Sequence, residues 1–415
     1  MVSVSTRPRA LFLTPVVPDG SGRGIAMRAA GHLRALAASF EVDLVVLGDP
    51  GAELAPLPAE TAALCRSRTV VAQAARAGPA LPNLPPLALF AEIVCPEHRR
   101  YLPDRAALAA LAAEIGEAPV DVLFCFRLRT GLLWAALAGR HGLRASRRVV
   151  DFDDVESEFI RRARIVESAH LGVERRLIER LAETRYRRIE NRFMRRFDLT
   201  LVCSTKDRDS LRARVPGARI EVVANAVTMP DTVTPPPAGA PVRILFVGTM
   251  SYPPNRDGAV FFCEDVLPRL RARTPAGLAV SLVGFDPPPE VRRLGDLPDV
   301  TVTGGVDSVV PYYRAAHFVV APIRYGGGTR IKILEALAHE RAVVSTTIGA
   351  EGLDLVPERE ILVADSADDF AEACARLIAA PDLRDRLARD GRCRVTATYD
   401  GKAVQAGLAA LLARS

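Results

Sequence analysis

The sequence alternates between short apolar runs and helical patterns, and it does so in two successive series. Apolar runs of strand length lie at 9–17, 41–49, 120–126 and 147–154, and most of the segments between them carry apolar residues at helical spacing. The same alternation starts again at 242–250 and continues toward the C-terminus. Because neighbouring parallel strands need a long, usually helical, crossover, this order predicts an α/β protein with two Rossmann-like, doubly wound domains.

A proline-rich segment, TMPDTVTPPPAGAP, separates the two series. We therefore predict an N-terminal acceptor-binding domain over 1–228, a linker over 229–241 and a C-terminal donor-binding domain over 242–395. The remaining residues, 396–415, are predicted to form a C-terminal helix that could pack back on the N-terminal domain. Open parallel sheets bind ligands beyond the carboxyl ends of their strands, so the two domains are expected to face a cleft.

The composition is that of a globular protein whose net positive charge suits anionic ligands. Of 415 residues, 49% are hydrophobic and 25% charged, and the formal net charge of +6 suits anionic ligands. Only three of the 55 basic residues are lysines, Lys206, Lys332 and Lys402. The seven cysteines are dispersed without a C-x-x-C pair, and no apolar stretch approaches the roughly 20 residues of a membrane span, so we expect a cytoplasmic protein.

A loop of three glycines, 326–328, follows an apolar run and precedes a helical pattern. Glycines allow positive φ angles and let a ligand reach the main-chain N–H groups. Thr329 is predicted to cap the helix, whose first turn carries Arg330 and Lys332. Cations are unfavourable at a helix N-terminus unless an anion binds there, so this pattern favours a phosphate site.

Glu335 lies one turn further along the predicted helix. Its carboxylate could accept hydrogen bonds from two vicinal hydroxyls, such as those of a ribose. It could equally form an ordinary surface pair with Lys332 at i,i+3 spacing. The residues alone leave both interpretations open.

Longer motifs resemble a known family. The segments VRILFVGTMSYPPNRDGAVFF, VTVTGGV and PIRYGGGTRIKILEALAHERAVVSTTIGAEGL are similar to the donor-binding domain of family 4 (group 1) retaining glycosyltransferases, which have the GT-B fold. The likeness runs from about residue 241 to the C-terminus. PVVPDGSGRG, FDLTLVCSTKDRDSL and VVANAV resemble the family's N-terminal half more loosely. The most similar subgroup is that of bacterial surface-polysaccharide enzymes.

The resemblance implies a retaining, metal-independent transfer of sugar from a nucleotide-diphosphate donor. The acceptor would be a saccharide or a lipid-linked molecule, in polysaccharide or glycoconjugate biosynthesis, with no cofactor beyond the nucleotide sugar. Two alternatives stay open, a nucleotide-sugar epimerase on the same fold and a non-catalytic binding subunit.

The family's roles carry over to named positions only in part. Glu335 matches the second glutamate of the E-x7-E motif, which holds the ribose, whereas Gly327 stands where the first glutamate would fall. The Arg/Lys pair expected after the first donor-domain strand is also absent, and Thr249 and Asn255 stand nearby. The predicted donor site comprises Gly22, Gly24, Gly248, Thr249, Asn255, Gly326, Gly327, Gly328, Thr329 and Glu335.

Three residues are the candidates for catalysis. We predict that Arg330 and Lys332 stabilise the leaving diphosphate in place of the missing pair. Asp153 and Asp154 stand where the family has a His-Asp pair, so Asp154 is the third candidate and Asp153 is placed on the acceptor side.

Other motifs receive less weight. Asp151 and Asp153 form a D-x-D sequence, which binds a metal–nucleotide complex in a different fold with a single nucleotide domain, so we predict no metal. DGSGRG lacks the G-x-G-x-x-G spacing that would support a dehydrogenase with Asp49.

The arginine-dense stretch 158–197 is predicted to be one long helix. It could contact an anionic membrane surface, but its glutamates favour a solvated helix. Aromatic and basic residues show no stacking pattern, so no nucleic-acid partner is predicted.

Overall fold

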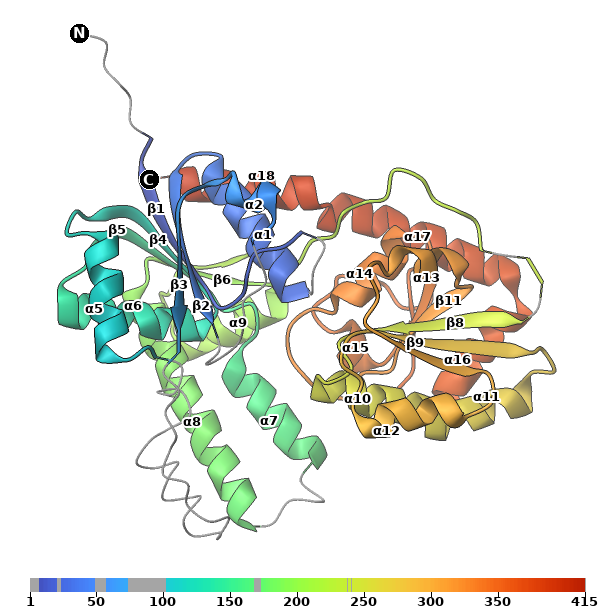
Figure 1. The fold of residues 1–415 in the computed structure, drawn as a ribbon. Coiled ribbons are helices and arrows are strands. Elements are labelled where there is room, and N and C mark those ends of the chain that lie inside the picture. The colour runs from blue at the N-terminus through green and yellow to red at the C-terminus, as the bar shows by residue number, and fades with distance from the viewer. Residues whose placement is uncertain are drawn as a thin grey trace. The chain divides into compact units, whose positions relative to one another are not determined.

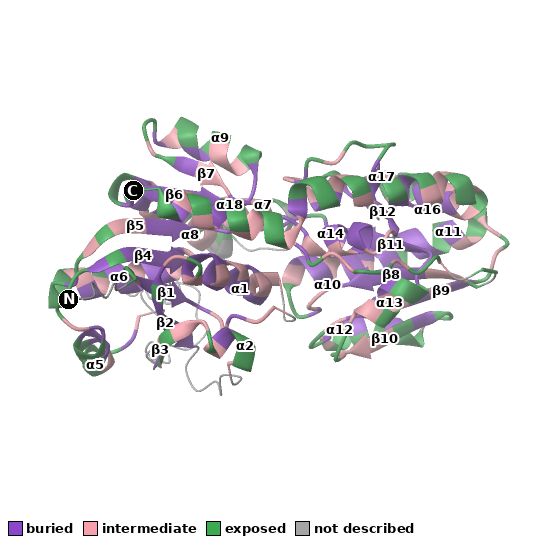
Figure 2. Ribbon diagram, turned by 90° about the horizontal axis from the view of Figure 1, so that it is seen from above, coloured by how far each residue is buried: buried purple, intermediate pink, exposed green. Residues whose placement is uncertain are grey.

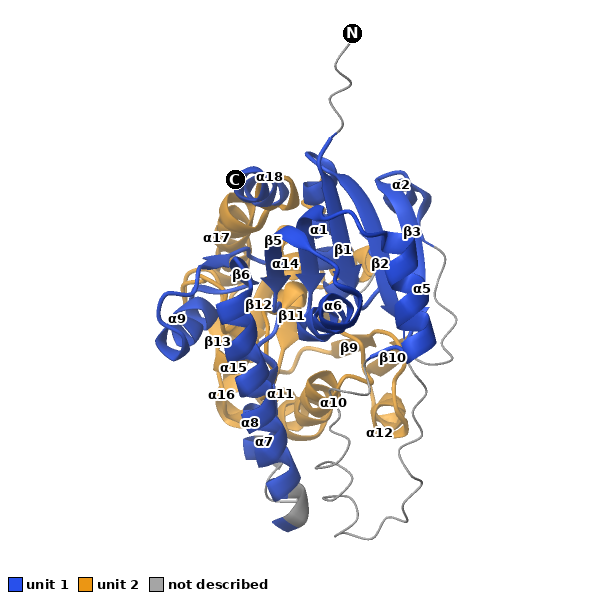
Figure 3. Ribbon diagram, turned by 90° about the vertical axis from the view of Figure 1, so that its left-hand side faces the viewer, with its two compact units in different colours: residues 1–224, 405–415 blue, residues 225–404 orange. Residues whose placement is uncertain are grey.

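The computed structural model describes residues 7–20, 24–48, 57–73, 102–167, 173–236, 238–239 and 241–414. The chain divides into two compact units, shown in Figures 1 and 3. Unit 1 is Met1–Ala224 with Gln405–Ser415, and unit 2 is Asn225–Val404. The division falls at Ala224, ahead of the predicted linker. Each unit is built on one wholly parallel sheet, which confirms the predicted α/β class.

Unit 1 has a seven-stranded sheet in the order β3-β2-β1-β4-β5-β6-β7. Its strands are β1 Arg9–Thr14, β2 Glu41–Gly48, β3 Cys65–Ala72, β4 Val120–Phe126, β5 Ala145–Asp151, β6 Leu199–Val202 and β7 Ile220–Val222. The order reverses between β1 and β4, which are hydrogen-bonded neighbours although α1, β2 and β3 lie between them in the chain. Such a switch point is where ligands bind in open α/β sheets.

The helices of unit 1 follow its strands as crossovers. They are α1 Gly24–Ala37, α2 Ala59–Ala62, α5 Arg105–Ile115, α6 Leu128–His141, α7 Glu156–Glu167, α8 Val173–Arg196 and α9 Thr205–Arg214. The predicted single helix over 158–197 is wrong, because the described residues form two helices, α7 and α8, that pack against each other. Pairing lets each helix bury one face against the other.

Unit 2 has a six-stranded sheet in the order β10-β9-β8-β11-β12-β13. Its strands are β8 Val242–Val247, β9 Leu278–Val283, β10 Val300–Gly304, β11 Phe318–Ala321, β12 Ala342–Ser345 and β13 Leu362–Val363. The switch point lies between β8 and β11, where Phe318 pairs with Ile244. The loops after these two strands therefore leave the same edge of the sheet side by side.

The helices of unit 2 include one continuous rod with an irregular middle. It consists of α10 Pro253–Val260, the π-helical turn Phe261–Val266 and α11 Leu267–Arg273. Pro268, which has no N–H to donate, is the second residue after the π turn. The other helical segments are α12 Pro289–Arg292, the 3-10 turn Arg293–Asp296, α13 Val310–Ala315, α14 Ile331–Ala338, α15 Thr347–Ala350, α16 Ala367–Ala379 and α17 Pro381–Tyr399.

Each sheet carries its own apolar core, visible as the buried strands of Figure 2. In unit 1, Phe12 and Phe124 meet edge to face with ring centroids 5.5 Å apart, and Trp134, the only tryptophan, is buried on α6. In unit 2, Phe262 and Phe370 are fully buried between the helical rod and α16. Sheets covered on both faces need such near-continuous apolar strands, as in β4.

The last helix, α18 Gly401–Ala413, brings the end of the chain to unit 1. Arg147 on β5 donates hydrogen bonds from its guanidinium to the carbonyl oxygens of Leu411, Leu412 and Arg414, at 3.1, 2.7 and 2.7 Å. Leu411 and Leu412 belong to the last turn of the helix, where carbonyls lack an intrahelical partner, and Arg414 directly follows the helix. Arg147 therefore fastens the C-terminal helix to unit 1.

No helix among the described residues is both long enough and apolar enough to cross a membrane.

Candidate functional site

The carboxyl edge of the unit 2 sheet brings together residues from the loops after β8 and β11. The Lys332 ammonium, in the first turn of α14, donates to Asn255 Oδ1 at 2.6 Å. Asn255, on α10, in turn donates from Nδ2 to the carbonyl of Thr249 at 2.8 Å. The same ammonium lies 4.5 Å from the centroid of the Phe246 ring. Three residues predicted from separate motifs thus form one contact network.

The contacts of Asn255 and Lys332 leave no space for a side chain at Gly248. A Cβ added at Gly248 would lie 2.7 Å from Asn255 Nδ2 and 2.8 Å from Lys332 Nζ. Any larger residue would therefore push the amide and the ammonium out of place. Gly284 faces the same turn from β9, since a Cβ there would meet the Gly248 carbonyl oxygen at 1.7 Å. The two glycines let the backbones of neighbouring loops come close together.

The Lys332 ammonium is held in an unfavourable environment. Burial, together with the nearby Arg330 charge, lowers the pKa of Lys332 to about 7, and Glu335 offsets this only in part. Among the described residues no carboxylate lies within 4.0 Å of the ammonium or of the Arg330 guanidinium. The site therefore holds two neighbouring basic groups without a paired acid.

Arg330 folds back over the glycine loop. Its side chain is 9% exposed, and its NH1 group donates to the carbonyl oxygens of Gly327 and Gly328, the latter at 2.7 Å. Its Nε is buried and has no hydrogen-bond partner among the described residues. Gly326, at φ 120°, leaves space for this side chain, because a Cβ there would lie 2.9 Å from Arg330 NH2.

Thr329 does not cap the helix, so that prediction is wrong. Helix α14 begins at Ile331, and Arg330 occupies the N-cap position without a side-chain cap. The Thr329 hydroxyl is instead used elsewhere, because it accepts a hydrogen bond from Asn225 Nδ2 at 2.7 Å. Both side chains are buried, so this contact fixes the loop between β11 and α14.

Glu335 is placed by an aromatic residue that the sequence analysis did not identify. The buried Tyr313 donates its hydroxyl hydrogen to Glu335 Oε2 at 2.9 Å. The Tyr313 ring also stacks on His339, with centroids 5.2 Å apart. Burial raises the pKa of Glu335, while the Tyr313 hydrogen bond and the Lys332 charge act against this rise. The only sequence signal for this contact was a tyrosine pair in the preceding crossover helix.

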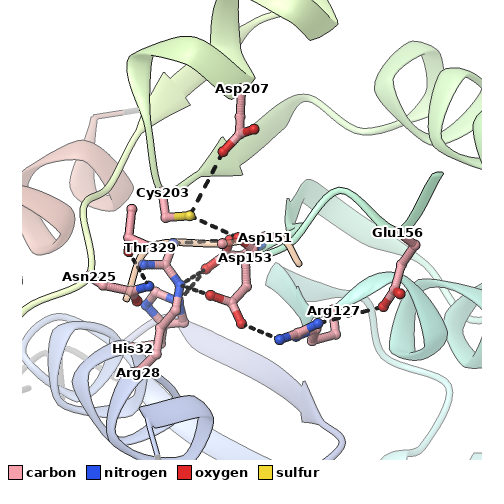
Figure 4. A network of polar contacts seen from close by, with 12 residues as sticks. Arg28, His32, Arg127, Asp151, Asp153, Glu156, Cys203, Asp207, Asn225 and Thr329 are labelled. Atoms are coloured by element: carbon pink, nitrogen blue, oxygen red, sulfur yellow. Dashed lines mark hydrogen bonds and ion pairs between the residues drawn. The ribbon is translucent and has the colours of Figure 1, made fainter. Parts of the chain in front are cut away.

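Unit 1 carries a second polar cluster at the end of β5, drawn in Figure 4. Asp151 is fully buried and accepts from Arg28 Nε at 2.8 Å and from Arg28 NH2 at 3.1 Å. His32, one turn further along α1, also contacts the Asp151 carboxylate. Burial alone would raise the pKa of Asp151, but the Arg28 guanidinium and His32 hold it well below its usual range.

Asp153 joins the same cluster through a strained backbone. It has a φ of 54°, and its carboxylate lies 2.7 Å from Arg127 NH2 and 3.5 Å from Arg28 Nε. Asp151 Oδ1 accepts from the Asp153 N–H at 2.8 Å. Asp154 is partly buried beside it. The D-x-D carboxylates thus face guanidinium groups, and no metal-ligand cluster occurs among the described residues.

Sequence reasoning missed the cationic members of this cluster. Arg28 and His32 are spaced four residues apart on one helix face, which was the available signal. Gly24, a predicted donor-site residue, is the first residue of α1, whereas Gly22 lies outside the described residues.

Solved structures share this two-sheet architecture over nearly the whole chain. Sucrose-phosphate synthase from Thermosynechococcus elongatus is 19% identical, with a TM-score of 0.70 over 97% of this chain and 98% of that one. Anabaena HepE in complex with UDP and glucose is 11% identical, with a TM-score of 0.65 over 98% and 100%. The lipopolysaccharide outer core galactosyltransferase WaaB is 14% identical, with a TM-score of 0.58 over 98% and 100%. The fold is therefore that of the GT-B glycosyltransferases.

A family model matches part of the chain, within unit 2. Residues 241–380, which contain the whole glycine-loop site, match the group 1 glycosyl transferases. No curated protein sequence matches the chain. The matched stretch is the same part of the chain whose motifs resemble the donor-binding domain of the group 1 (family 4) glycosyltransferases.

Proposed function

We propose that the chain is a retaining, metal-independent glycosyltransferase whose donor diphosphate binds over Arg330 and Lys332. The acceptor is a saccharide or a lipid-linked molecule, and the enzyme works in the cytoplasm in polysaccharide or glycoconjugate biosynthesis. One observation carries this proposal: two neighbouring basic groups lie at the sheet's switch point, and the described residues offer neither of them a carboxylate within 4.0 Å. A bound diphosphate supplies the missing negative charge.

The two cations act on the leaving group in different ways. Lys332 takes up a proton when the diphosphate binds, because its ordinary pKa is restored by the new negative charge. The Arg330 guanidinium exchanges the loop carbonyls for phosphate oxygens, which are stronger acceptors because they are charged. Charge that builds up on the departing diphosphate is then neutralised by side chains, without a metal ion.

Glu335 is proposed to hold the donor's ribose hydroxyls. Its Oε2 is occupied by Tyr313, which fixes the carboxylate and leaves Oε1 for a hydroxyl hydrogen. Gly327 supplies no side chain where the family's first motif glutamate would contact the sugar. When Arg330 binds the diphosphate, it releases the carbonyl oxygens of Gly327 and Gly328. These oxygens are then the hydrogen-bond acceptors for the donor sugar at this position.

In unit 1, Asp154 is proposed to act in catalysis and Asp153 on the acceptor side. The ion pairs of Asp153 with Arg28 and Arg127 hold the turn that carries both aspartates. Asp153 therefore positions Asp154, while Asp154 is the residue that contacts the reacting groups. The acceptor hydroxyl attacks the face of the sugar that the diphosphate leaves, which retains the configuration.

The test is nucleotide release from a panel of nucleotide sugars by the purified full chain, beginning with UDP-glucose. HepE has been solved with UDP-glucose, which makes this donor the first choice. Lys332→Met should lower kcat by about 10²–10³, the usual effect of removing one group that stabilises developing charge. Lys402→Met, the matched loss of an exposed lysine, should leave turnover unchanged.

Three outcomes would overturn the proposal. Binding of nucleotide sugars without release, with any acceptor preparation, would indicate a binding subunit. Isomerised sugar on intact nucleotide would indicate an epimerase. Loss of turnover on chelation of divalent metal would show that Arg330 and Lys332 do not suffice for the leaving group.

A further inference from the structure

Helices α7 and α8 form a hairpin that projects from the sheet of unit 1 (Figure 1). The proposed sugar transfer gives this hairpin no role. Helix α8 has 24 residues, which corresponds to a length of about 36 Å. Arginine and glutamate residues are interspersed along α8. The charge of the helix surface therefore depends on which of these side chains face outward.

Two glutamates of α8, Glu183 and Glu190, make inward contacts. Glu190 is 1% exposed and accepts from Ser157 Oγ and from Arg214 NH2, both at 2.6 Å. Glu183 pairs with Arg164 of α7 at 3.2 Å. Because these carboxylates are consumed by inward contacts, they do not neutralise the outer face of the helix.

The outer face of α8 is consequently cationic. Its exposed arginines are Arg176, Arg180, Arg187, Arg188, Arg192, Arg195 and Arg196. Most of them recur at four-residue intervals, which places them in a stripe along the helix. No acidic side chain of α8 is exposed among those the structure describes. We call this set of seven the arginine stripe.

Apolar side chains are exposed at the projecting end of the hairpin. Val173 is 79% exposed and Leu177 44% exposed at the start of α8, and Ile165 is 55% exposed near the end of α7. Exposed positions of a soluble helical hairpin are normally polar, whereas here three branched apolar side chains lie beside the first residues of the arginine stripe.

We propose that this end of the hairpin docks on an anionic lipid bilayer. Val173, Leu177 and Ile165 enter the boundary between headgroups and acyl chains, and the arginine stripe binds lipid phosphates. A nucleic acid or an acidic protein would satisfy the arginines but offers no apolar phase for the exposed side chains. The surface lies in unit 1 and does not depend on the donor site.

The test is co-sedimentation of the full chain with phosphatidylcholine vesicles, with and without phosphatidylglycerol. Binding is expected only to the anionic vesicles and should weaken as salt is added. The triple variant Arg176→Gln, Arg180→Gln, Arg188→Gln should weaken binding by about tenfold to a hundredfold. The matched control removes the same charge from exposed arginines of other segments, Arg105→Gln, Arg140→Gln, Arg144→Gln, and should bind like the wild type.

A second variant separates a bilayer from other anionic partners. Val173→Ser with Leu177→Ser keeps every charge and should weaken vesicle binding by about tenfold, because less apolar surface enters the membrane. Circular dichroism and UDP binding confirm that each variant is folded. Equal binding of this variant and the wild type would assign the stripe to an anionic macromolecule instead. Absence of vesicle binding by a wild type that still binds UDP would overturn the docking surface and leave the sugar transfer intact.

Discussion

The pKa of Lys332 can be measured directly, because the chain has only two other lysines. Protein labelled with ¹³C at the lysine ε-carbon should give three lysine signals in a proton–carbon NMR spectrum. Lys332→Arg removes one of them and assigns it. Since the ammonium is buried beside Arg330, the assigned signal should titrate with a midpoint of about 7.

The size of the effect follows from the two pKa values. A fall from 10.5 to about 7 is worth about 5 kcal/mol at 1.36 kcal/mol per unit, which is an upper bound for a partly exposed side chain. Between these pH values the unfolded chain binds more protons at Lys332 than the folded chain does. The free energy of unfolding should therefore rise with pH, by about 2 kcal/mol from pH 7 to pH 9, and this rise should be absent in Lys332→Met.

UDP should reverse the shift. A diphosphate beside the ammonium favours its charged form, so saturation with UDP should move the Lys332 midpoint upward by at least about one unit. The titration midpoint of this one signal therefore distinguishes the empty site from the site with UDP bound. A midpoint near the ordinary lysine value in the free protein would refute the reasoning about burial. A midpoint that UDP leaves unchanged would refute the placement of the diphosphate.

Three further substitutions test other contacts. Asp151→Asn leaves the buried Arg28 without its counter-charge and should lower the free energy of unfolding by about 3–5 kcal/mol. Tryptophan fluorescence should then show unit 1 unfolding at a lower denaturant concentration. An unchanged unfolding midpoint would show that the ion pair is dispensable. Gly248→Ala should weaken UDP binding about tenfold or more in calorimetry without unfolding the chain, because its Cβ displaces the lysine ammonium. Tyr313→Phe frees Glu335 and should raise KM several-fold while kcat changes little; a kcat defect of equal size would place the carboxylate in the chemical step.

Much of the fold could be predicted because buried parallel strands are nearly continuous apolar runs. VDVLFCF coincides with β4, Val120–Phe126, since this central strand is covered on both faces. The strand β3, CRSRTVVA, was missed because its burial alternates and its exposed positions include charged residues. Periodicity also failed to show that the long arginine-rich stretch forms a helical pair.

The candidate site was predictable where local motifs meet the edge of a sheet. Gly248, Asn255 and Lys332 come from segments that follow β8 and β11, and the doubly wound order makes these strands neighbours. The partners of Asp151 and Thr329 were not predictable in this way. Arg28 lies 123 residues from Asp151, and Asn225 lies 104 residues from Thr329, so no local pattern relates them.

The C-terminal helix also determines when unit 1 can be completed during synthesis. The segment that carries Arg147 is made first, and the carbonyls that it binds, those of Leu411, Leu412 and Arg414, lie 264, 265 and 267 residues further along the chain. All of Asn225–Val404 is translated in between, which at 5–20 residues per second takes roughly ten to forty seconds. During that interval the ribosome holds a seven-stranded sheet that lacks α18. A nascent chain of this kind has an exposed surface for chaperones, and a premature stop codon ahead of α18 would leave that surface uncovered.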